Sequence, residues 1–147
     1  MSDRVPPRPR PRPEPTAYTR SFWEATRRGE LLLQHCRSCD EWIFYPRPCC
    51  VRCGGTELDA TAASGRGTIY SYTVARRATH PAFRDRVPYV IAIVELAEGP
   101  RLTTNLVECE VDAVAIGMPV ELTFEPELLG IALPLFKPAL ASSRRDV

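Results

Sequence analysis

The second half of the chain alternates apolar and polar positions in the manner of short β-strands. Residues 120–124 (VELTF) place apolar side chains on one face and charged or polar side chains on the other. Residues 89–96 (YVIAIVEL) are almost wholly apolar, as expected of a strand buried on both sides. Strand patterns also cover 68–74, 102–107 and 128–136. Five short strands separated by turn residues predict a small closed barrel, and the OB fold matches this size.

Two of these strands have features that a structure can test. In 68–74, Tyr70 and Tyr72 fall on one face. Aromatic residues in that pattern more often belong to a core, and an exposed stacking face is the alternative. In 128–136, apolar residues recur at every second position, and Pro134 indicates an edge position or a bulge.

The first thirty residues predict a tail followed by one short helix. Residues 4–15 (RVPPRPRPRPEP) alternate Arg and Pro, which excludes helix and central strand and predicts a disordered polyproline-type tail. A helix is expected over 19–29. Ser21 and Glu24 fit an S-x-x-E capping box at its start, and Gly29 can end it.

So short a helix needs another surface to pack on. Phe22 and Trp23 are its only large apolar residues. These two side chains either pack on the chain's own domain or contact a partner protein. Our hypothesis is that both contact a partner protein.

Composition and charge narrow the function classes. Of 147 residues, 44% are hydrophobic and 25% are charged, which indicates a mostly globular chain. Nineteen basic against eighteen acidic residues give a net charge of +1, which argues against a strongly basic nucleic-acid binder and a polybasic membrane protein. No apolar run approaches ~18 residues, and no secretory signal is recognisable. We therefore expect a cytoplasmic protein with reduced cysteines.

Four of the six cysteines carry the clearest chemical signal. Cys36 and Cys39 form one C-x2-C pair, and Cys50 and Cys53 form a second pair, with ten residues between the two pairs. This is the spacing of a zinc ribbon, in which each pair turns two thiolates the same way and two pairs complete a tetrahedron. We predict one structural Zn²⁺ per chain. The alternatives are free thiols or disulfides.

The other cysteines and the two histidines have no expected role at the metal. Cys49 lacks the x2 spacing to Cys53, and the remote Cys109 is expected to be a buried apolar residue. His35 lies beside the first cysteine pair and His80 lies in a loop, where a solvated position is usual. The sequence contains no G-x-S-x-G motif and no phosphate loop, and four thiolates leave a zinc ion no open position. We predict that the chain is not an enzyme by itself.

The loop at 75–88 and the start of the next strand carry groups that could bind a ligand with phosphates and an aromatic or acyl group. Arginine side chains present forked donors suited to phosphates, and aromatic rings can lie against an adenine or acyl group. The alternative is a mobile loop with ordinary surface arginines. The candidate residues are Arg76, Arg77, Phe83, Arg84 and Tyr89.

A different function class is single-stranded nucleic-acid binding, because zinc ribbons and OB folds both occur in such modules. That function needs a basic groove with exposed aromatic residues. The last two predicted strands and their connection instead carry Glu121, Glu125 and Glu127. Nucleic-acid binding therefore remains an alternative only.

The order of these motifs resembles a known family. The segments that carry the resemblance are HCRSCDEWIFYPRPCCVRCGGTEL, GRGTIYSYT and PYVIAIVEL. Together they resemble the zinc-ribbon (rubredoxin-like) plus OB-fold proteins associated with acyl-CoA metabolism, over about residues 18–139. Asp40 departs from the pattern, since many members have glycine after the first cysteine pair, and so does Cys49.

The resemblance implies a non-catalytic subunit of a thiolase-like enzyme, a thiolase or a retro-aldolase, in steroid, aromatic or fatty acyl degradation. It implies a heterotetramer with a CoA thioester at or near the interface, and it makes the candidate residues of the 75–88 loop and Tyr89 the expected CoA-ester site. Neither nucleic acid nor a membrane is an expected partner. A hotdog-fold enoyl-CoA hydratase is the alternative partner. The expected fold is mainly β, with a tail (1–17), an N-terminal helix (18–30), a zinc ribbon (31–60), a five-stranded OB barrel (61–140) and a C-terminal tail (141–147).

Overall fold

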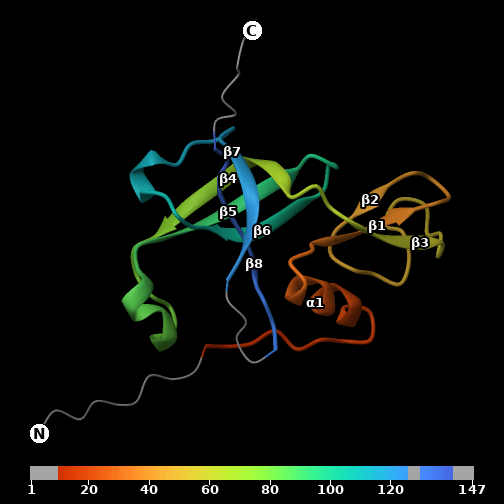
Figure 1. The fold of residues 1–147 in the computed structure, drawn as a ribbon, viewed down its shortest axis with the longest axis horizontal. Coiled ribbons are helices and arrows are strands. Elements are labelled where there is room, and N and C mark those ends of the chain that lie inside the picture. The colour runs from red at the N-terminus through yellow and green to blue at the C-terminus, as the bar shows by residue number, and fades with distance from the viewer. Residues whose placement is uncertain (1–9, 126–129, 141–147) are drawn as a thin grey trace, which may run out of the picture.

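A computed structural model describes residues 10–125 and 130–140. It is mainly β, with one α-helix, a three-stranded sheet and a closed five-stranded barrel, which confirms the predicted fold class (Figure 1). The elements in chain order are α1 (Arg20–Arg27), β1 (Leu32–Cys36), β2 (Trp42–Ile43), β3 (Leu58–Ala62), β4 (Arg66–Ala75), η1 (Pro81–Arg86), β5 (Tyr89–Leu96), β6 (Arg101–Leu106), η2 (Val111–Ala113), β7 (Pro119–Phe124) and β8 (Pro134–Pro138).

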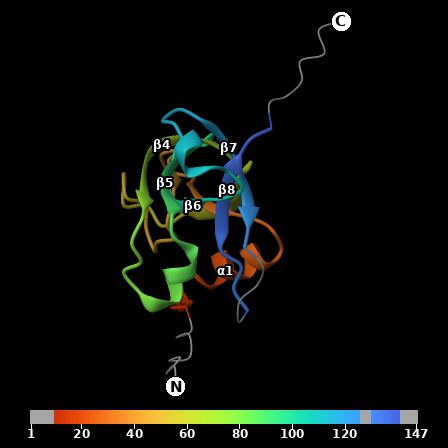
Figure 2. The ribbon, with the colours of Figure 1, turned by 90° about the vertical axis from the view of Figure 1, so that its left-hand side faces the viewer.

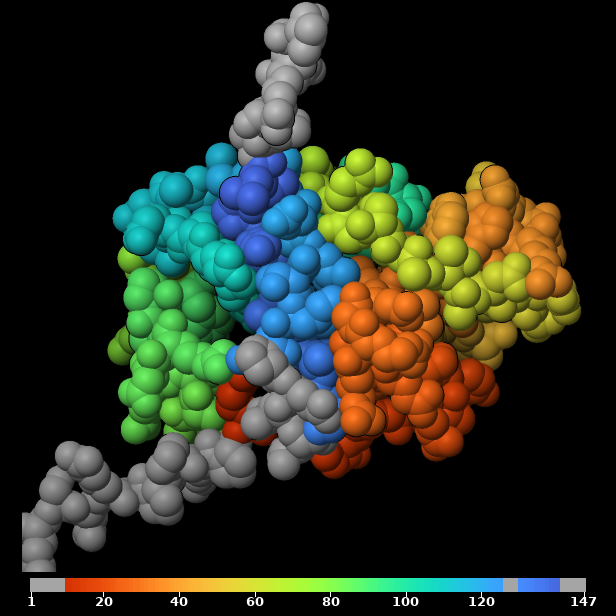
Figure 3. Space-filling view, in the orientation of Figure 1, coloured from red at the N-terminus to blue at the C-terminus, as the bar shows by residue number. Residues whose placement is uncertain are grey.

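The three-stranded sheet has the order β2-β1-β3, and both of its pairings are antiparallel. It projects from the side of the barrel as a separate lobe (Figure 3). The barrel closes in the order β4-β5-β6-β8-β7, and all of its pairings are antiparallel except the one between β6 and β8. Within the described residues, no helix has the length and apolar character to span a membrane.

The barrel and the lobe share one hydrophobic core. Phe22 of α1 and Leu33 of β1 are 2% and 1% exposed, and they belong to the same cluster as the barrel interior. The buried barrel residues of this cluster are Ile69, Val90, Ala92, Val94, Leu96, Leu102, Leu106, Val114, Val120 and Phe136. A second, smaller cluster of Cys36, Ile43 and Cys50 lies inside the lobe.

Strand β5 is buried on one side only, which corrects the prediction of burial on both sides. Its residues alternate between buried and half-buried positions, with Ile91 and Ile93 on the outer face. The outer positions remain half-exposed because a single sheet that closes on itself has one inner face and no second layer outside it.

The prediction that Tyr70 and Tyr72 belong to the core is wrong, since their exposed fractions are 48% and 36%. The register of β4 against β5 shifts between Ile69 and Ser71, which shows an irregularity of the β-bulge type. Ile69, which is 1% exposed, takes the inner position. Tyr70 points outward, where the guanidinium of Arg101 lies 3.6 Å from the centre of its ring.

Helix α1 begins before the predicted capping box. Thr19 is the N-cap residue, so Ser21 lies inside the first turn and does not cap it. The Thr19 hydroxyl accepts a hydrogen bond from the backbone N–H of Thr16, 2.9 Å away, in the turn that leads into the helix. Gly29 ends the helix as predicted, with φ +78° and a backbone N–H donated to the Thr26 carbonyl.

The last strand begins later than predicted. Strand β8 starts at Pro134, which pairs with Phe124 of β7, and residues 128–129 of the predicted strand lie outside the described residues. Gly130 has φ +84°, a turn conformation that glycine adopts readily. A proline is tolerated as the first residue of a strand because its missing N–H then interrupts no ladder.

The Arg-Pro segment makes contacts that the sequence did not predict. Residues 1–9 lie outside the described residues, as do residues 141–147 of the predicted C-terminal tail. From Arg10 onward the chain lies along the barrel, and Arg10 forms an ion pair with Glu125, which follows β7. The partner is 115 residues away in sequence, so no local pattern could indicate it.

Substitution of Gly67 is expected to destabilise the barrel. A Cβ atom at this position would lie 2.6 Å from the Glu95 carbonyl oxygen and 2.6 Å from Val94 Cγ1. Because β4 and β5 would have to move apart, Gly67→Ala should lower the free energy of unfolding by about 1–3 kcal/mol, measured by urea denaturation. Gly99→Ala is a poor control, because Gly99 has φ +114°, so Ala97→Ser on the exposed β5–β6 turn serves instead.

Candidate metal centre and binding loop

Four cysteine thiols meet in the lobe. The Sγ atoms of Cys36, Cys39, Cys50 and Cys53 all lie within 4.8 Å of one another. The Sγ–Sγ distance is 3.7 Å between Cys36 and Cys53 and 3.6 Å between Cys39 and Cys50. A tetrahedral Zn²⁺ with Zn–S bonds of ~2.3 Å separates its sulfurs by about 3.8 Å, so the cluster fits one zinc ion.

The two cysteine pairs have the same local geometry. Asp40 and Gly54, each four residues after the first cysteine of a pair, have φ values of +64° and +76°. Each donates its backbone N–H to the carbonyl of that first cysteine, at 2.9 Å in both cases. Glycine adopts this left-handed backbone freely, and aspartate is among the few other residues that do. Asp40 therefore fills the turn in place of the family's glycine without opening it.

Backbone donors surround the thiols of the second pair. The N–H groups of Arg52 and Gly55 donate to the Sγ atoms of Cys50 and Cys53, both at 3.4 Å. Hydrogen bonding from the backbone of Cys53 lowers the pKa of Cys50 to about 7, whereas burial raises the pKa of Cys39 to about 12. A zinc ion binds thiolates, so its positive charge would stabilise the thiolate form of Cys39 that burial disfavours.

The remaining cysteines and His35 do not join the cluster. The Cys49 side chain is exposed, and Cys109 is half-buried against the barrel core. His35 is held by Asp40, with Nε2 2.7 Å from the carboxylate, and its ring centre lies 4.6 Å from that of Trp42. The four-cysteine cluster is the one group of possible metal ligands found within the described residues.

The predicted CoA-ester residues are spread over both ends of the loop. Phe83 of η1 lies 6.1 Å from Tyr89 and 6.2 Å from His80, measured between ring centres. His80 caps η1, and its Nδ1 accepts the backbone N–H of Ala82. Arg76 is directed elsewhere, since its Nη2 lies 3.6 Å from Asp112. The structure thus brings Phe83 and Tyr89 together in one aromatic group near Arg84.

Of the two predicted partner-contact residues, only one has exposed surface. Phe22 is 2% exposed and packs against the rings of Trp23, Phe44 and Tyr45, at 4.9, 5.8 and 5.5 Å between centres. Its side chain belongs to the chain's own core, which corrects that part of the hypothesis. Trp23 is half-buried and keeps some surface for a partner.

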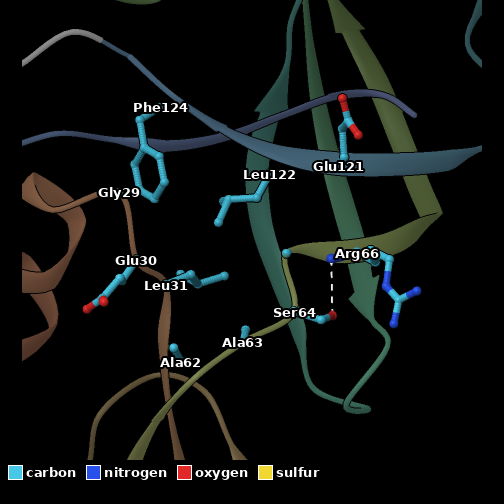
Figure 4. Close-up of a pocket in the computed structure, with 11 residues that line it drawn as sticks. Gly29, Glu30, Leu31, Ala62, Ala63, Ser64, Arg66, Glu121, Leu122 and Phe124 are labelled. Atoms are coloured by element: carbon cyan, nitrogen blue, oxygen red, sulfur yellow. Dashed lines mark hydrogen bonds between the residues drawn. The ribbon is translucent and has the colours of Figure 1, made fainter. Parts of the chain in front are cut away.

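A hollow lies where the lobe joins the barrel (Figure 4). It has a volume of about 420 Å³. Leu31, Leu122 and Phe124 supply apolar side chains, while Arg66 and Glu121 lie at its barrel end. None of the predicted site residues line this hollow, so it is a feature of the junction and not of the metal centre.

Comparisons with known proteins place the lobe and the barrel in one family. Residues 23–59 match the family model described as ChsH2, rubredoxin-like zinc ribbon domain, and residues 60–125 match ChsH2, C-terminal OB-fold domain. A DUF35 domain-containing scaffold protein of Methanocaldococcus jannaschii is 39% identical over 106 residues, covering 71% of this chain and 74% of that protein.

Two longer relatives carry enzyme names. A probable enoyl-CoA hydratase alpha subunit of Thermomonospora curvata is 46% identical over 124 residues, covering 82% of this chain. The 3-oxo-4,17-pregnadiene-20-carboxyl-CoA hydratase alpha subunit of Mycobacterium tuberculosis is 36% identical over 107 residues, covering 72% of it. The chain spans only 37% and 33% of the lengths of these two proteins.

Two solved structures have similar folds. A chain of the Ltp2-ChsH2(DUF35) aldolase is 42% identical with a TM-score of 0.79, and the match covers 88% of this chain and all of that one. A DUF35 protein of unknown function from Sulfolobus solfataricus has a TM-score of 0.61 at 13% identity, covering 84% of this chain and 86% of that one, which shows a shared fold alone.

Proposed function

This chain belongs to the DUF35 (ChsH2) family of zinc-ribbon and OB-fold proteins, and we propose that it is a non-catalytic subunit of a thiolase-superfamily enzyme that acts on CoA thioesters. The four clustered cysteines of its rubredoxin-like ribbon fit one structural Zn²⁺. The observation that carries the proposal is the likeness to a chain of the Ltp2-ChsH2(DUF35) aldolase, which this chain matches over that chain's whole length.

The chemistry of the described residues supports a non-catalytic role. The four clustered thiols would all be ligands of the metal, which leaves the ion no open coordination position. His35 is held by Asp40 and His80 caps a turn, so neither histidine is paired with a nucleophile within the described residues. The reacting groups would then come from the partner enzyme, a thiolase or a retro-aldolase.

In this proposal the chain contributes binding surface to a cytoplasmic complex, a heterotetramer with two copies of each subunit. Arg84 and the aromatic group of Phe83 and Tyr89 would contact the CoA ester near the interface. Trp23 would contact the partner. The acyl degradation pathway, whether steroid, aromatic or fatty, depends on the enzyme it joins.

A hydratase is the second candidate partner, and the names of the two longer relatives favour it. Both are called hydratase alpha subunits, and this chain matches about a third of each. In that case the chain would serve the same supporting role beside a hotdog-fold enoyl-CoA hydratase. The two candidates differ only in the enzyme bound.

Co-expression decides between the partners. The tagged chain should co-elute in equal amounts with a thiolase-like aldolase. That enzyme's cleavage of a carbon–carbon bond in its CoA-thioester substrate should be at least about tenfold faster with the chain than without it. The chain alone should show no turnover of any CoA thioester. The Cys49→Ser variant should co-elute with the aldolase and support its activity as the wild type does, because its exposed side chain lies outside the metal cluster.

Three results would count against the proposal. Turnover by the purified chain would make it an enzyme. Equal activity of the aldolase with and without the chain would remove the supporting role, and selective co-elution with the hydratase would move the chain to the second candidate.

A further inference from the structure

The first described residues of the chain bind to the barrel beside the end of β7. Arg10 Nη1 lies 2.7 Å from Glu125 Oε1, and both side chains are only 18% exposed. In two perpendicular views the start of the described chain, drawn in red, runs beside the green η1 turn (Figures 1 and 2). A short, shielded ion pair of this kind is stronger than one between two freely solvated side chains.

Glu125 also binds the η1 turn itself. Arg86, the last residue of η1, places Nη2 2.8 Å from the same Glu125 oxygen. Glu125 is anchored to the barrel, because it follows β7 directly and donates its backbone N–H to the Leu133 carbonyl at 3.0 Å. Burial raises the pKa of Glu125, but the hydrogen bonds from the two arginines outweigh it and the pKa is lowered. The carboxylate is thus ionised and shared by two arginines.

Aromatic and apolar contacts extend the same attachment. The guanidinium of Arg10 lies 5.5 Å from the centre of the Phe83 ring, within range of a cation–π interaction. Pro11 and Pro13 line a small hollow together with Ile131 and Leu133. Prolines restrict the backbone before it binds, so the segment loses little entropy when it lies down on the barrel.

We infer that residues 10–13 form a strap that holds the η1 turn in place through Glu125. Phe83 lies beneath Arg10 of the strap, and Arg84 is the next residue after Phe83. Arg10 and Glu125 are therefore positioning residues for the loop that we propose binds the CoA ester. That second step rests on the proposed function, whereas the strap itself does not. One carboxylate between two guanidiniums leaves a net positive charge, so the attachment preserves the attraction of this surface for phosphates.

Hydrogen exchange of the zinc-loaded full chain tests the strap. Amide exchange over residues 82–86 should become about fivefold to tenfold faster in Arg10→Ala and in Glu125→Gln. The double variant should exchange more slowly than the sum of the two single effects predicts, because both changes break the same Arg10–Glu125 ion pair. Arg10→Lys should recover part of the protection. Arg47→Ala, which removes an exposed arginine from the lobe, is the matched control and should have no effect.

Unchanged exchange over 82–86 in both single variants would overturn the strap, provided that zinc content and melting temperature match those of the wild type. Fully additive effects in the double variant would also overturn it, because they would mean independent contacts.

Titration with coenzyme A tests the positioning step separately. If the wild-type chain binds coenzyme A, the dissociation constant should rise about threefold to tenfold in Arg10→Ala and Glu125→Gln. Equal affinities would overturn the positioning role. A wild-type chain that binds no coenzyme A would remove the proposed CoA-ester site together with the positioning role, while the exchange data would still decide the strap.

Discussion

Cys39→Ser is expected to abolish stable zinc binding and to unfold the metal-binding lobe. The lobe has only a small core of its own, formed by Cys36, Ile43 and Cys50, of which two members are themselves predicted ligands. Structural zinc contributes roughly 10–16 kcal/mol in zinc-finger peptides at pH 7, far more than so few apolar contacts can replace. Zinc per chain should fall from one to near zero, measured by metal analysis after gel filtration.

Cys49→Ser provides the matched control for this prediction. Cys49 is adjacent to a predicted ligand, but its thiol is exposed and lies outside the cluster. Its loss should leave one zinc per chain and an unchanged melting temperature. The reverse pattern, in which Cys49→Ser loses the metal and Cys39→Ser keeps it, would contradict the assigned ligand set.

Phe22→Ala should lower the free energy of unfolding of the zinc-loaded chain by about 3–5 kcal/mol. Phe22 is 2% exposed and stands at the meeting point of α1, the lobe and the barrel core. Its removal leaves a cavity among the rings of Trp23, Phe44 and Tyr45, which cannot all close in on it. Urea denaturation followed by circular dichroism measures the change.

Tyr18→Ala and Phe22→Leu are the control variants for this measurement. Tyr18 precedes the same helix but is 60% exposed, so its loss should cost less than about 1 kcal/mol. Phe22→Leu keeps most of the buried volume and should fall between the two. If Phe22→Ala were as stable as Tyr18→Ala, then Phe22 would not be a core residue, and the original hypothesis of a partner contact would regain support.

The features that the sequence predicted well are those encoded by neighbouring residues. The C-x2-C spacing forces two sulfurs into one turn, and the clustered thiols follow from two such turns. The presence of a strand at β7, with Val120 buried, and the position of Gly29 after α1 also depend on local patterns alone. For these elements, the chain's local preferences and its tertiary structure agree.

The features that the sequence missed depend on distant residues or on a single shifted position. Ile69 takes the inner face, so its neighbour Tyr70 faces outward, and no alternation pattern reveals where the strand departs from strict pairing beside it. The Arg-Pro segment has the composition of a solvated tail, and its partners Glu125 and Phe83 become visible only when the barrel has closed. Proline content predicted the extended backbone but not the surface on which it lies.

The shared core limits how the lobe and the barrel can be exchanged with those of relatives. The matched family models divide the chain between residues 59 and 60, a border that falls inside β3 (Leu58–Ala62). A chimera joined at that border would split one strand and would separate Leu33 from the barrel residues it packs with. Grafting a ribbon from a relative onto this barrel should therefore succeed only when α1 through β3 are transplanted as one block with their barrel-facing side chains intact.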